Sequence, residues 1–326
     1  MNRTDFEIYG DVECDCFTID EYKELNSYYS STAQAFIDEY DLDSEKLKNQ
    51  KLTSETIDAR IAADSFDKAT TIQKARLNAC SAKGAAAWIA SIPTYSNKIP
   101  ALEFLTIVRM WIGVKLYNPD LENTQHSNGL TKCKACQKMV ADPYGIHWIM
   151  CQVTRGGLFY GMTKKHNVIR NIIFDYCKAV HLEPEKEKHG LCINVGKDCP
   201  ADIYLPVFSG TMPVAIDIGL TNPLQSKYLT EAAVEPMCVG DHYADAKWKK
   251  YLPKIDRNEL VYMPFVMETF GGMTHGAQKI LKKICYDMRS KYKMDFSHIY
   301  NLKRRELVIK LWRGNAKMAL DRLPSQ

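Results

Sequence analysis

The chain has 326 residues, of which 46% are hydrophobic, and its formal net charge is +4. This length and composition predict a globular protein with about two or three packed units and exclude a disordered or fibrous chain. The net charge is too small to identify a partner by itself.

Acidic and basic residues are distributed unevenly along the chain. Residues 1–66 form an acidic N-terminal segment with the cluster Asp38, Glu39, Asp41, Asp43 and Glu45. Residues 276–326 are expected to form basic helices, and the bases from residue 274 onwards include Lys279, Lys282, Lys283, Arg289, Lys291, Lys293, Lys303, Arg304, Arg305 and Lys310. This basic face could attract the phosphates of a nucleic acid. The alternative is that these bases only make the helices soluble.

The sequence gives no sign of secretion or of membrane insertion. Acidic residues stand where a secretory signal would have a basic start and an apolar run, so we expect an intracellular protein. The most apolar stretch, residues 101–117, is interrupted by charges and is expected to be a buried helix without membrane contact. The eleven cysteines favour metal ligation and core packing over a disulfide framework. Cys14 and Cys16 have no second ligand pair nearby, so no metal site is expected there.

Residues 67–125 are predicted to form a small helical domain. An alanine-rich run over residues 76–89 has apolar residues at helical spacing and is closed by Pro93. A second helix is expected from Ala101 to Val114, and its predicted apolar face is formed by Leu102, Leu105, Val108 and Ile112. This pattern indicates structural helices and no site.

Residues 126–158 contain a pattern of metal ligands. Two residues separate Cys133 from Cys136, ten separate Cys136 from His147, and three separate His147 from Cys151. Three thiolates and one imidazole form a tetrahedral set that suits Zn²⁺. All four ligands would be used by the ion, so this zinc knuckle is expected to be structural. The alternative is that Cys133 and Cys136 are incidental thiols and His147 is a buried, hydrogen-bonded histidine.

Residues 159–275 predict an α/β domain. A helix is expected over residues 163–177, with His166 and Arg170 one turn apart at the border of its apolar stripe. The alternative for these two residues is a surface pair on an ordinary amphipathic helix. Three strands, a helix ending at Tyr251 and a further strand follow, and their ranges are 191–195, 198–205, 212–218 and 260–268. This order predicts an α/β fold with one sheet covered by helices.

Two acidic residues interrupt the apolar strand patterns. Asp202 and Asp217 lie on strands that a turn at Ser209 and Gly210 would join as a hairpin, which could bring the two carboxylates together. Mg²⁺ prefers oxygen ligands and usually takes one or two carboxylates, so the pair suits a Mg²⁺ or Mn²⁺ site for phosphodiester hydrolysis. The alternative is that both acids face solvent at a sheet edge.

Three further residues are candidates for the same site. Lys247 and Lys250 share one helix face, so a lysine there could reach the two acids and orient the attacking water or stabilise the transition state. The alternative is that both lysines only solvate the helix. Glu268 ends an otherwise apolar strand and is either a third acid near the site or a charge at a sheet edge.

These motifs, in this order, resemble the C-terminal third of non-LTR retrotransposon proteins that carry a restriction-like endonuclease of the PD-(D/E)XK superfamily. The set Cys133, Cys136, His147 and Cys151 is similar to the family's cysteine-histidine motif. Lys165-His166-Asn167, followed by Arg170, looks like its Arg-His-Asn helix. Residues 200–203 and 215–217 resemble its acidic strands, and residues 247–251 and 266–271 resemble its lysine and glutamate motifs. With the flanking helices at 81–85 and 311–316, the resemblance covers roughly residues 70–326.

The resemblance implies a zinc-stabilised nuclease with a restriction-endonuclease-like mixed sheet, which nicks DNA with a metal-activated water to prime reverse transcription. Asp202 and Asp217 would bind Mg²⁺, and the further catalytic residues would be His166, Lys247, Lys250 and Glu268. DNA is the expected partner, RNA is a second candidate, and a reverse transcriptase domain or partner is implied. The expected location is the nucleus.

The chain departs from the family's pattern at three points. Gly219 occupies the usual position of the superfamily's lysine, so a lysine of the following helix would have to replace it. Cys199 stands where a basic residue often precedes the proline, and no polymerase motif is present. A second hypothesis is therefore a catalytically inactive nucleic-acid-binding module of the same origin. A third is a structural remnant with neither activity.

Overall fold

The computed structural model describes residues 50–95, 97–117, 132–140, 142–193, 200–208 and 212–323, with side chains from residue 58 onwards. The chain divides into two compact units, Met1–Asp67 and Lys68–Gln326. In the first unit the described part is helix α2 (Gln50–Lys68), in which Arg60 and Asp64 form an ion pair. The predictions for Cys14, Cys16 and the acidic cluster at residues 38–45 fall outside the described residues.

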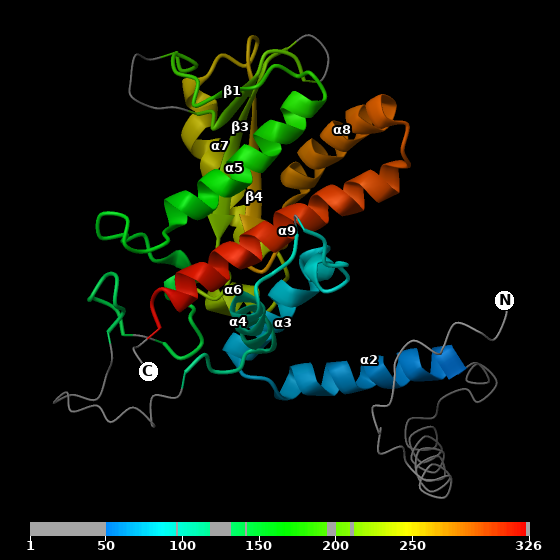
Figure 1. Cartoon of the computed structure of the whole chain (residues 1–326), viewed down its shortest axis with the longest axis vertical. Coiled ribbons are helices and arrows are strands. Elements are labelled where there is room, and N and C mark those ends of the chain that lie inside the picture. The colour runs from blue at the N-terminus through cyan, green and yellow to red at the C-terminus, as the bar shows by residue number, and fades with distance from the viewer. Residues whose placement is uncertain are drawn as a thin grey trace, which may run out of the picture. The chain divides into compact units, whose positions relative to one another are not determined.

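The second unit contains a mixed sheet flanked by helices, so the chain is an α/β protein as predicted (Figure 1). Its strands are β1 (Glu185–Lys186), β2 (Ile203–Leu205), β3 (Val214–Thr221) and β4 (Val261–Glu268), in this spatial order. The pairs β1–β2 and β2–β3 are antiparallel, and β3–β4 is parallel. The hairpin of the two acid-bearing segments is therefore confirmed, although its predicted turn lies outside the described residues.

Strand β3 is the centre of this sheet, and all of its residues are buried. Ile216 and Ile218 belong to the larger hydrophobic core, whereas Ala215 belongs to a smaller core with Tyr262. Helix α5 (Met162–Ala179) crosses one face of the sheet, and α7 (Cys238–Tyr251) covers the other (Figure 1). A strand covered on both faces reads as a continuous apolar run, so an acid within it needs a partner inside the protein.

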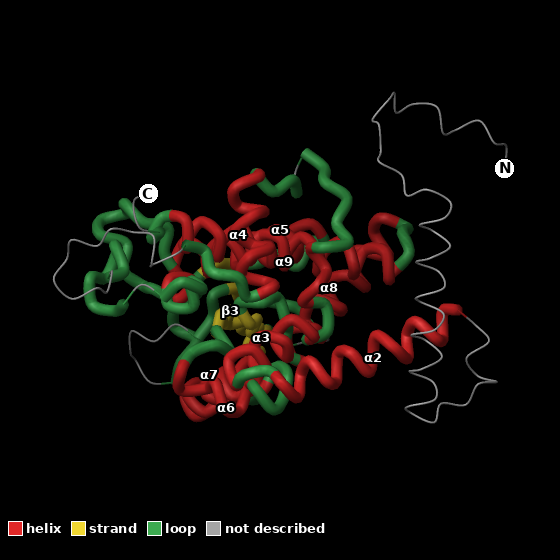
Figure 2. The backbone as a smooth tube through the Cα atoms, turned by 90° about the horizontal axis from the view of Figure 1, so that it is seen from below, coloured by secondary structure: helices red, strands yellow, loops and turns green. Residues whose placement is uncertain are grey.

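Helix α9 (Phe296–Leu320) is the axis of the larger core, where it contacts α4 (Ala101–Ile112), α5 and α8 (His275–Tyr292) (Figure 2). Trp312 of α9 packs against Trp88, Trp111 and Phe270, with ring centroids 5.3 to 6.2 Å apart. Residues from Ala75 to Ala319 share this core. The segments 67–125, 126–158, 159–275 and 276–326 therefore pack together within one unit.

Short helices connect these elements; they are η2 (Ala85–Trp88), η3 (Trp148–Met150), η4 (Ser226–Tyr228), α6 (Leu229–Ala232) and η5 (Leu252–Lys254). Among the described residues, no helix combines the length and the apolar character that are needed to cross a bilayer.

The alanine-rich run at residues 76–89 does not form the single helix that its spacing predicted. Helix α3 (Thr71–Ser81) ends before Gly84, and the 3-10 helix η2 follows. Gly84 has a φ of 88°, a left-handed conformation that suits glycine and ends a helical path. A Cβ atom at this position would also lie 2.8 Å from Cδ of Arg304, so the turn and its packing on α9 both require glycine.

Helix α4 is present, but its predicted apolar face is wrong. Leu102, Leu105 and Ile112 are 62%, 47% and 53% exposed, whereas Glu103 and Ile107 are buried. Glu103 accepts a hydrogen bond of 2.6 Å from Nε of Arg313 on α9. This ion pair and the tryptophan cluster turn the opposite side of α4 towards the core.

The strand predicted at residues 191–195 is also wrong for its described part. Leu191 packs against the smaller core, and the N–H of Ile193 donates to the carbonyl of Lys254 at 2.7 Å. The segment is therefore held by the packing of Leu191 and by a main-chain hydrogen bond to η5, and the described part does not join the sheet. The remaining positions of the predicted strand lie outside the described residues.

A chain of buried polar groups joins the zinc-ligand segment to the helices and the sheet. The ammonium of Lys165 on α5 donates to Ile149 O at 2.6 Å and to Asn315 Oδ1 at 2.9 Å. Asn315 of α9 in turn donates to Thr269 O at 2.7 Å. Thr269 Oγ1 donates to Asn222 Oδ1 at 3.1 Å, and Asn222 Nδ2 donates to Ile146 O at 3.2 Å. The links from Lys165 to Asn222 are buried groups that satisfy one another, as such networks require, and the last link, to Ile146 O, is partly buried.

We predict that Asn315→Ala destabilises the second unit by roughly 2 to 4 kcal/mol, because it removes one of the two acceptors of the buried Lys165 ammonium and the amide donor to the carbonyl of Thr269. Asn301→Ala, at an exposed position of the same helix, is the matched control and should change stability by less than about 0.5 kcal/mol. Urea unfolding of both variants tests this. Equal midpoints for wild type and Asn315→Ala would show that the network does not hold the fold.

Candidate functional site

The four predicted zinc ligands come together in the structure. The ligand atoms of Cys133, Cys136, His147 and Cys151 all lie within 4.8 Å of one another. Cys133 and Cys151 are buried, and the other two are half-buried. Three sulfurs and one imidazole nitrogen at this spacing form a closed set that can hold Zn²⁺.

Local hydrogen bonds shape this cluster. Asp142 accepts the N–H groups of Ile146 and His147 at 2.8 and 2.9 Å, which fixes the turn before the second ligand pair. Burial would raise the pKa of the Cys136 thiol, but the N–H groups of residues 138 and 139 and the side chains of His147 and Cys133 lower it to about 6. A thiol that loses its proton easily is prepared for metal ligation.

We predict about one zinc ion per chain in the purified protein. Cys136→Ser should lose this ion and lower the thermal unfolding midpoint, because a structural zinc site contributes directly to folding. Cys238→Ser, at a half-buried cysteine outside the cluster, is the control and should retain the metal. Metal analysis by mass spectrometry gives the readout, and an equal zinc content in the two variants would remove the site.

Asp202 lies directly before β2 and binds the edge of β3. Its Oδ2 accepts the main-chain N–H of Ile218 at 2.7 Å and lies 3.2 Å from Nε2 of His166. The same imidazole nitrogen lies 3.2 Å from Ile218 O. The pairing of β2 with β3 ends at Ile203. The side chains of Asp202 and His166 therefore bind the N–H and the carbonyl of Ile218, which no residue of β2 pairs with.

Asp217 lies in the middle of β3 and faces α7. Lys247 of α7 donates to both carboxylate oxygens at 2.8 Å. Tyr262 of β4 donates its hydroxyl to Oδ2 at 2.5 Å. All three side chains are largely excluded from solvent, with exposed fractions of 11% and 15% for the side chains of Asp217 and Lys247 and 1% for residue Tyr262. The buried acid therefore has a charged partner and a neutral one.

The two acids lie next to the last pair of the β2–β3 ladder. Ile203 pairs with Ile216, so Asp202 stands one residue before this pair and Asp217 one residue after it. The acids also influence the same charges, because the Asp202 charge acts to raise the pKa of Asp217 and the Lys247 ammonium acts to lower that of Asp202. The hairpin therefore brings the two acid-bearing segments together, as predicted.

Burial and partners shift the pKa values in this acid cluster, defined as Asp202, Asp217, His166, Lys247 and Tyr262. Burial raises the pKa of Asp217, against the opposing effects of Lys247 and Tyr262. Burial would also raise that of Asp202, but His166 and the Ile218 N–H outweigh it and lower the pKa. The carboxylate of Asp202 overcomes the burial of His166 and raises the imidazole's pKa. Asp202 and His166 therefore stabilise each other's charged forms.

Gly219 makes room for Lys247 beside the acid cluster. A Cβ atom at position 219 would lie 2.9 Å from Cε of Lys247 and 2.8 Å from Cε1 of Tyr243. Contacts below 3.0 Å require one of these groups to move. The residue without a side chain on β3 therefore lets α7 bring its lysine down to Asp217.

The other predicted residues lie elsewhere or have other partners. Lys250 donates to the hydroxyl of Tyr251 at 2.8 Å, and Arg170 is paired with Glu187. Glu268 pairs with Thr221 in the β3–β4 ladder, whereas Asp217 pairs with Pro264. Four residues of strand correspond to about 13 Å, so Glu268 is not brought to the acid cluster.

Glu268 is instead a buried acid beside the start of α7. It is 1% exposed, and its Oε1 accepts the N–H of Gly240 at 2.9 Å. Its Oε2 has no hydrogen-bond partner among the described residues. Burial raises the pKa of Glu268 to about 7, with Gly240 opposing and Asp241 adding to the shift. The side chain is therefore protonated over most of the acid range.

We predict that Glu268 makes the fold less stable as pH rises from about 4.5 to about 7. The folded state binds a proton that the unfolded carboxyl has already released over this window, so stability falls with rising pH, by on the order of 3 kcal/mol in total. Glu268→Gln should flatten this slope, and Glu259→Gln, at an exposed acid, should not. Thermal unfolding across this pH range is the measurement. Parallel slopes for Glu268→Gln and wild type would show that Glu268 is ionised in the fold.

Tyr262 is a site residue that the sequence analysis did not identify. It lies on β4, two residues before the Pro264 that faces Asp217 in the ladder. Burial, followed by the charge of Asp217, raises the pKa of its hydroxyl, so it stays a donor at neutral pH. The available signal was the polar hydroxyl in an apolar strand, but only the parallel pairing of β3 and β4 directs it to Asp217.

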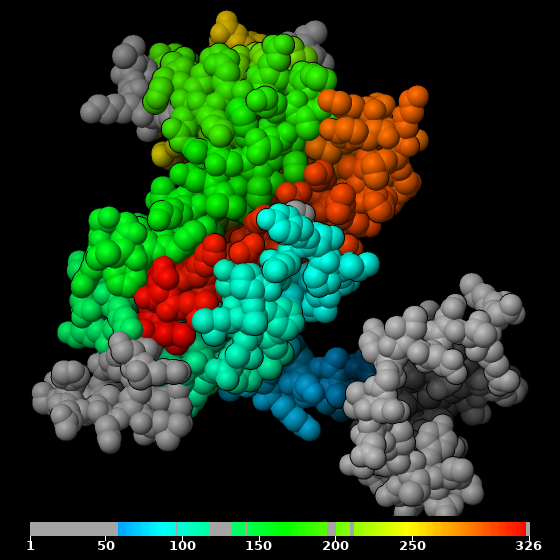
Figure 3. Space-filling model, in the orientation of Figure 1, coloured from blue at the N-terminus to red at the C-terminus, as the bar shows by residue number. Residues whose placement is uncertain are grey.

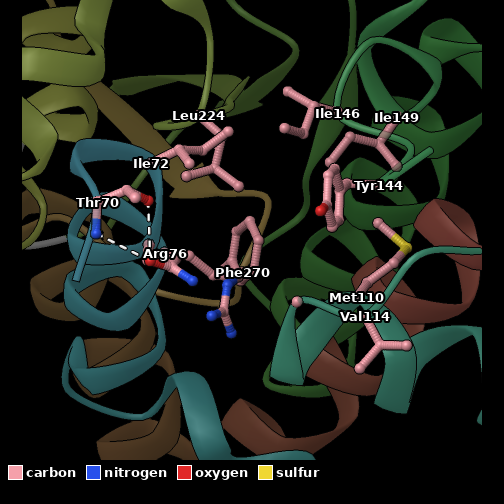
Figure 4. A pocket seen from close by; sticks show the side chains of 12 residues that line it. Thr70, Ile72, Arg76, Met110, Val114, Tyr144, Ile146, Ile149, Leu224 and Phe270 are labelled. Atoms are coloured by element: carbon pink, nitrogen blue, oxygen red, sulfur yellow. Dashed lines mark hydrogen bonds between the residues drawn. The ribbon is translucent and has the colours of Figure 1, made fainter. Parts of the chain in front are cut away.

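An apolar pocket of about 250 Å³ lies away from the acid cluster, between α3, α4 and the loop that carries Tyr144 (Figure 4). Its lining includes Ile72, Met110, Ile149 and Phe270. Arg76 is its one charged lining residue, and that guanidinium donates to Trp111 O at 2.8 Å. This lining offers no acid or base pair for catalysis.

The chain matches no protein-family model, and no similar sequence is found among curated proteins. The resemblance to restriction-like endonucleases of retrotransposons therefore stays a prediction.

Proposed function

We propose that this chain is a Mg²⁺-dependent, zinc-stabilised DNA endonuclease with a restriction-endonuclease-like fold. The observation that carries the proposal is that Asp202 and Asp217 flank the last pair of the β2–β3 ladder, with Lys247 bound to Asp217 in the space above Gly219. Two carboxylates and a lysine in a mixed sheet are the groups that metal-assisted hydrolysis of a phosphodiester needs.

The residues of the acid cluster fit Mg²⁺ or Mn²⁺. Asp202 and Asp217 offer carboxylate oxygens. The main-chain oxygen of Ile218 is a further oxygen nearby, because Nε2 of His166 lies 3.2 Å from it and 3.2 Å from Oδ2 of Asp202. Oxygen donors with one or two carboxylates are the set that Mg²⁺ takes when it also binds phosphate and water. Both carboxylate oxygens of Asp217 bind the positively charged ammonium of Lys247, so this carboxylate already stabilises a cation.

A bound Mg²⁺ would polarise the scissile phosphate and lower the pKa of the attacking water. The chain's own residues have separate tasks. His166 holds Asp202 ionised, and Tyr262 orients Asp217. Once Lys247 is displaced from Asp217 by a metal ion, its ammonium is positioned to stabilise negative charge on the phosphate. Of the two predicted lysines, Lys247 donates to Asp217, whereas Lys250 donates to Tyr251.

A groove of about 810 Å³ lies near this site, although no residue of the acid cluster lines it. It is lined by His147 on the zinc side and by Tyr228 and Tyr243 on the other, and Tyr243 lies next to Lys247. The ammonium of Lys227 lies 4.2 Å from the ring centroid of Tyr228. Aromatic rings with lysines beside them suit a nucleic-acid strand, since bases stack on rings and phosphates pair with ammonium groups.

The proposed setting is that of a non-LTR retrotransposon protein or its derivative. Such a protein would act on DNA in the nucleus, and a reverse transcriptase domain or partner would extend the nicked strand. The support is the order of motifs from the zinc cluster through α5, β2, β3 and α7 to β4, together with the zinc cluster's geometry. RNA remains a second candidate ligand for the same basic surfaces.

A catalytically inactive nucleic-acid-binding module is the second candidate function, and one observation favours it. Each acid of the pair already has a basic partner, His166 for Asp202 and Lys247 for Asp217. A metal ion would have to displace Lys247 or share Asp217 with it. If the ion cannot do so, the fold keeps its surfaces for nucleic acid and lacks hydrolysis.

We predict that wild-type protein converts supercoiled plasmid to nicked circles with Mg²⁺, and that Asp217→Asn and Lys247→Ala each lower the rate by about 100-fold or more, because each removes a group used in the transition state. Lys249→Ala, at an exposed position of the same helix, is the matched control and should nick at the wild-type rate. Plasmid binding by all variants is measured alongside. Binding without nicking by the wild type would support the inactive module, and equal nicking by Asp217→Asn would contradict the proposed site.

A further inference from the structure

Helix α8 has two opposite faces. Its buried residues are Ala277, Ile280, Leu281, Ile284, Cys285 and Met288, which pack into the larger core. On the other side, at spacings of three and four residues, lie Lys279, Lys282, Tyr286 and Arg289, and Lys293 follows as the left-handed C-cap residue of the helix. At 3.6 residues per turn the four helical positions form one narrow stripe, which ends at Lys293. We call this stripe the α8 ridge.

Every residue of the α8 ridge is exposed, and the helix lies at the surface of the second unit (Figure 3). The ridge combines four positive charges with one tyrosine, and none of its positions is acidic. The one acid of α8 is Asp287, which lies off the ridge and accepts a hydrogen bond from Lys283 at 2.8 Å. The positive charge of the ridge is therefore not balanced from within its own helix.

A hollow lies at the C-terminal end of the ridge. It has a volume of about 570 Å³ and is lined by Tyr286, Arg289, Ser290, Lys293, Met294 and Asp295. Asp295 is engaged in capping α9, because its Oδ1 accepts the N–H of His298 at 2.9 Å. Arg289 lies beside the ring of Tyr286, with its guanidinium carbon 5.9 Å from the ring centroid. Two cations and an aromatic ring thus surround one depression.

We propose that the α8 ridge is a docking surface for the phosphate backbone of DNA. Ten residues of helix rise about 15 Å from Lys279 to Arg289, which matches about four nucleotides of a duplex strand, and Lys293 extends the charged surface at the C-terminal end. The buried face anchors α8, so its cations are presented on a rigid element. The hollow beside Tyr286 would receive a phosphate, or a base stacked on the ring.

The side chains of the α8 ridge favour nucleic acid over a membrane surface. A helix that lies on a bilayer inserts large apolar side chains beside its basic ones. The ridge has no aliphatic side chain, and its single aromatic residue, Tyr286, is 55% exposed among the cations. An alternation of cations with a stacking ring is the arrangement that binds nucleic acid without reading its sequence.

The α8 ridge takes its partner, DNA, from the proposed function, but it uses none of the acids, the metal or Lys247. Phosphate contacts made along α8 would position a duplex without specifying its sequence. DNA binding by the ridge would persist in a protein whose acid cluster does not cleave. Failure of nicking and failure of docking are therefore separate results.

The test is fluorescence anisotropy of the whole protein with a 20-base-pair duplex, in the absence of divalent cations and over a series of salt concentrations. The ridge variant combines Lys279→Gln, Lys282→Gln, Arg289→Gln and Lys293→Gln. The control removes four exposed cations from other elements, Lys83→Gln, Lys98→Gln, Lys249→Gln and Arg257→Gln. Both variants change the net charge equally, and their thermal unfolding midpoints report whether the fold is kept.

We expect the slope of log K against log salt to fall by about 3 to 4 in the ridge variant, because each lost phosphate contact removes about one unit. The control should lose less than about half of that. Equal losses in the two variants would show only a general effect of net charge and would overturn the proposal, as would an unchanged slope in the ridge variant.

Vesicles of phosphatidylserine and phosphatidylcholine form the second arm of the test. The α8 ridge proposal expects weak vesicle binding that is similar in wild type and ridge variant. Vesicle binding that depends on the ridge, together with DNA binding that does not, would assign this surface to a membrane instead.

Discussion

The ammonium group of Lys165 is the interaction on which the arrangement of the second unit depends. It lies 1% exposed in the interior, and its two hydrogen-bond acceptors belong to the zinc-ligand segment and to α9. Burial, with Arg322 nearby, lowers its pKa to about 7, so the cost of burying the charge is offset only while Ile149 O and Asn315 remain in place. One side chain thereby fixes α5, α9 and the zinc cluster relative to each other, and α5 carries His166 to the sheet. The acid cluster takes its shape from this framework.

The sequence predicted the elements whose patterns are local. Strands β3 and β4 and helices α5 and α7 follow from apolar runs and helical spacing, and the zinc cluster follows from ligand spacing. It failed where distant residues decide: α4 buries Glu103 because Arg313, 210 residues away, pairs with it. Leu191 and Ile193 form no strand because η5 offers a packing surface and a carbonyl. In each case local periodicity was overridden by a tertiary contact.

The acid cluster shows the same division. Asp202 and Asp217 were recognisable because each interrupts an apolar run, and the hairpin between them was expected. The choice between Lys247 and Lys250 depends on how α7 packs above Gly219, and Tyr262 depends on the parallel register of β3 with β4. Glu268 was assigned to the site as one possibility, yet the same register sets it four residues beyond Asp217. Residue types in the sequence suggested the chemistry of the site, but strand register and helix packing determine which residues contact Asp217.

We expect a divalent cation to take the place on Asp217 that Lys247 holds in this structure. Crystals grown with Mn²⁺ and measured for its anomalous scattering test this exchange. We predict a single peak between the carboxylates of Asp202 and Asp217, with the ammonium of Lys247 moved away from at least one carboxylate oxygen. A structure without that peak, in which Lys247 still binds both oxygens of Asp217 at high Mn²⁺ concentration, would contradict the proposed nuclease and leave the chain as a nucleic-acid-binding module.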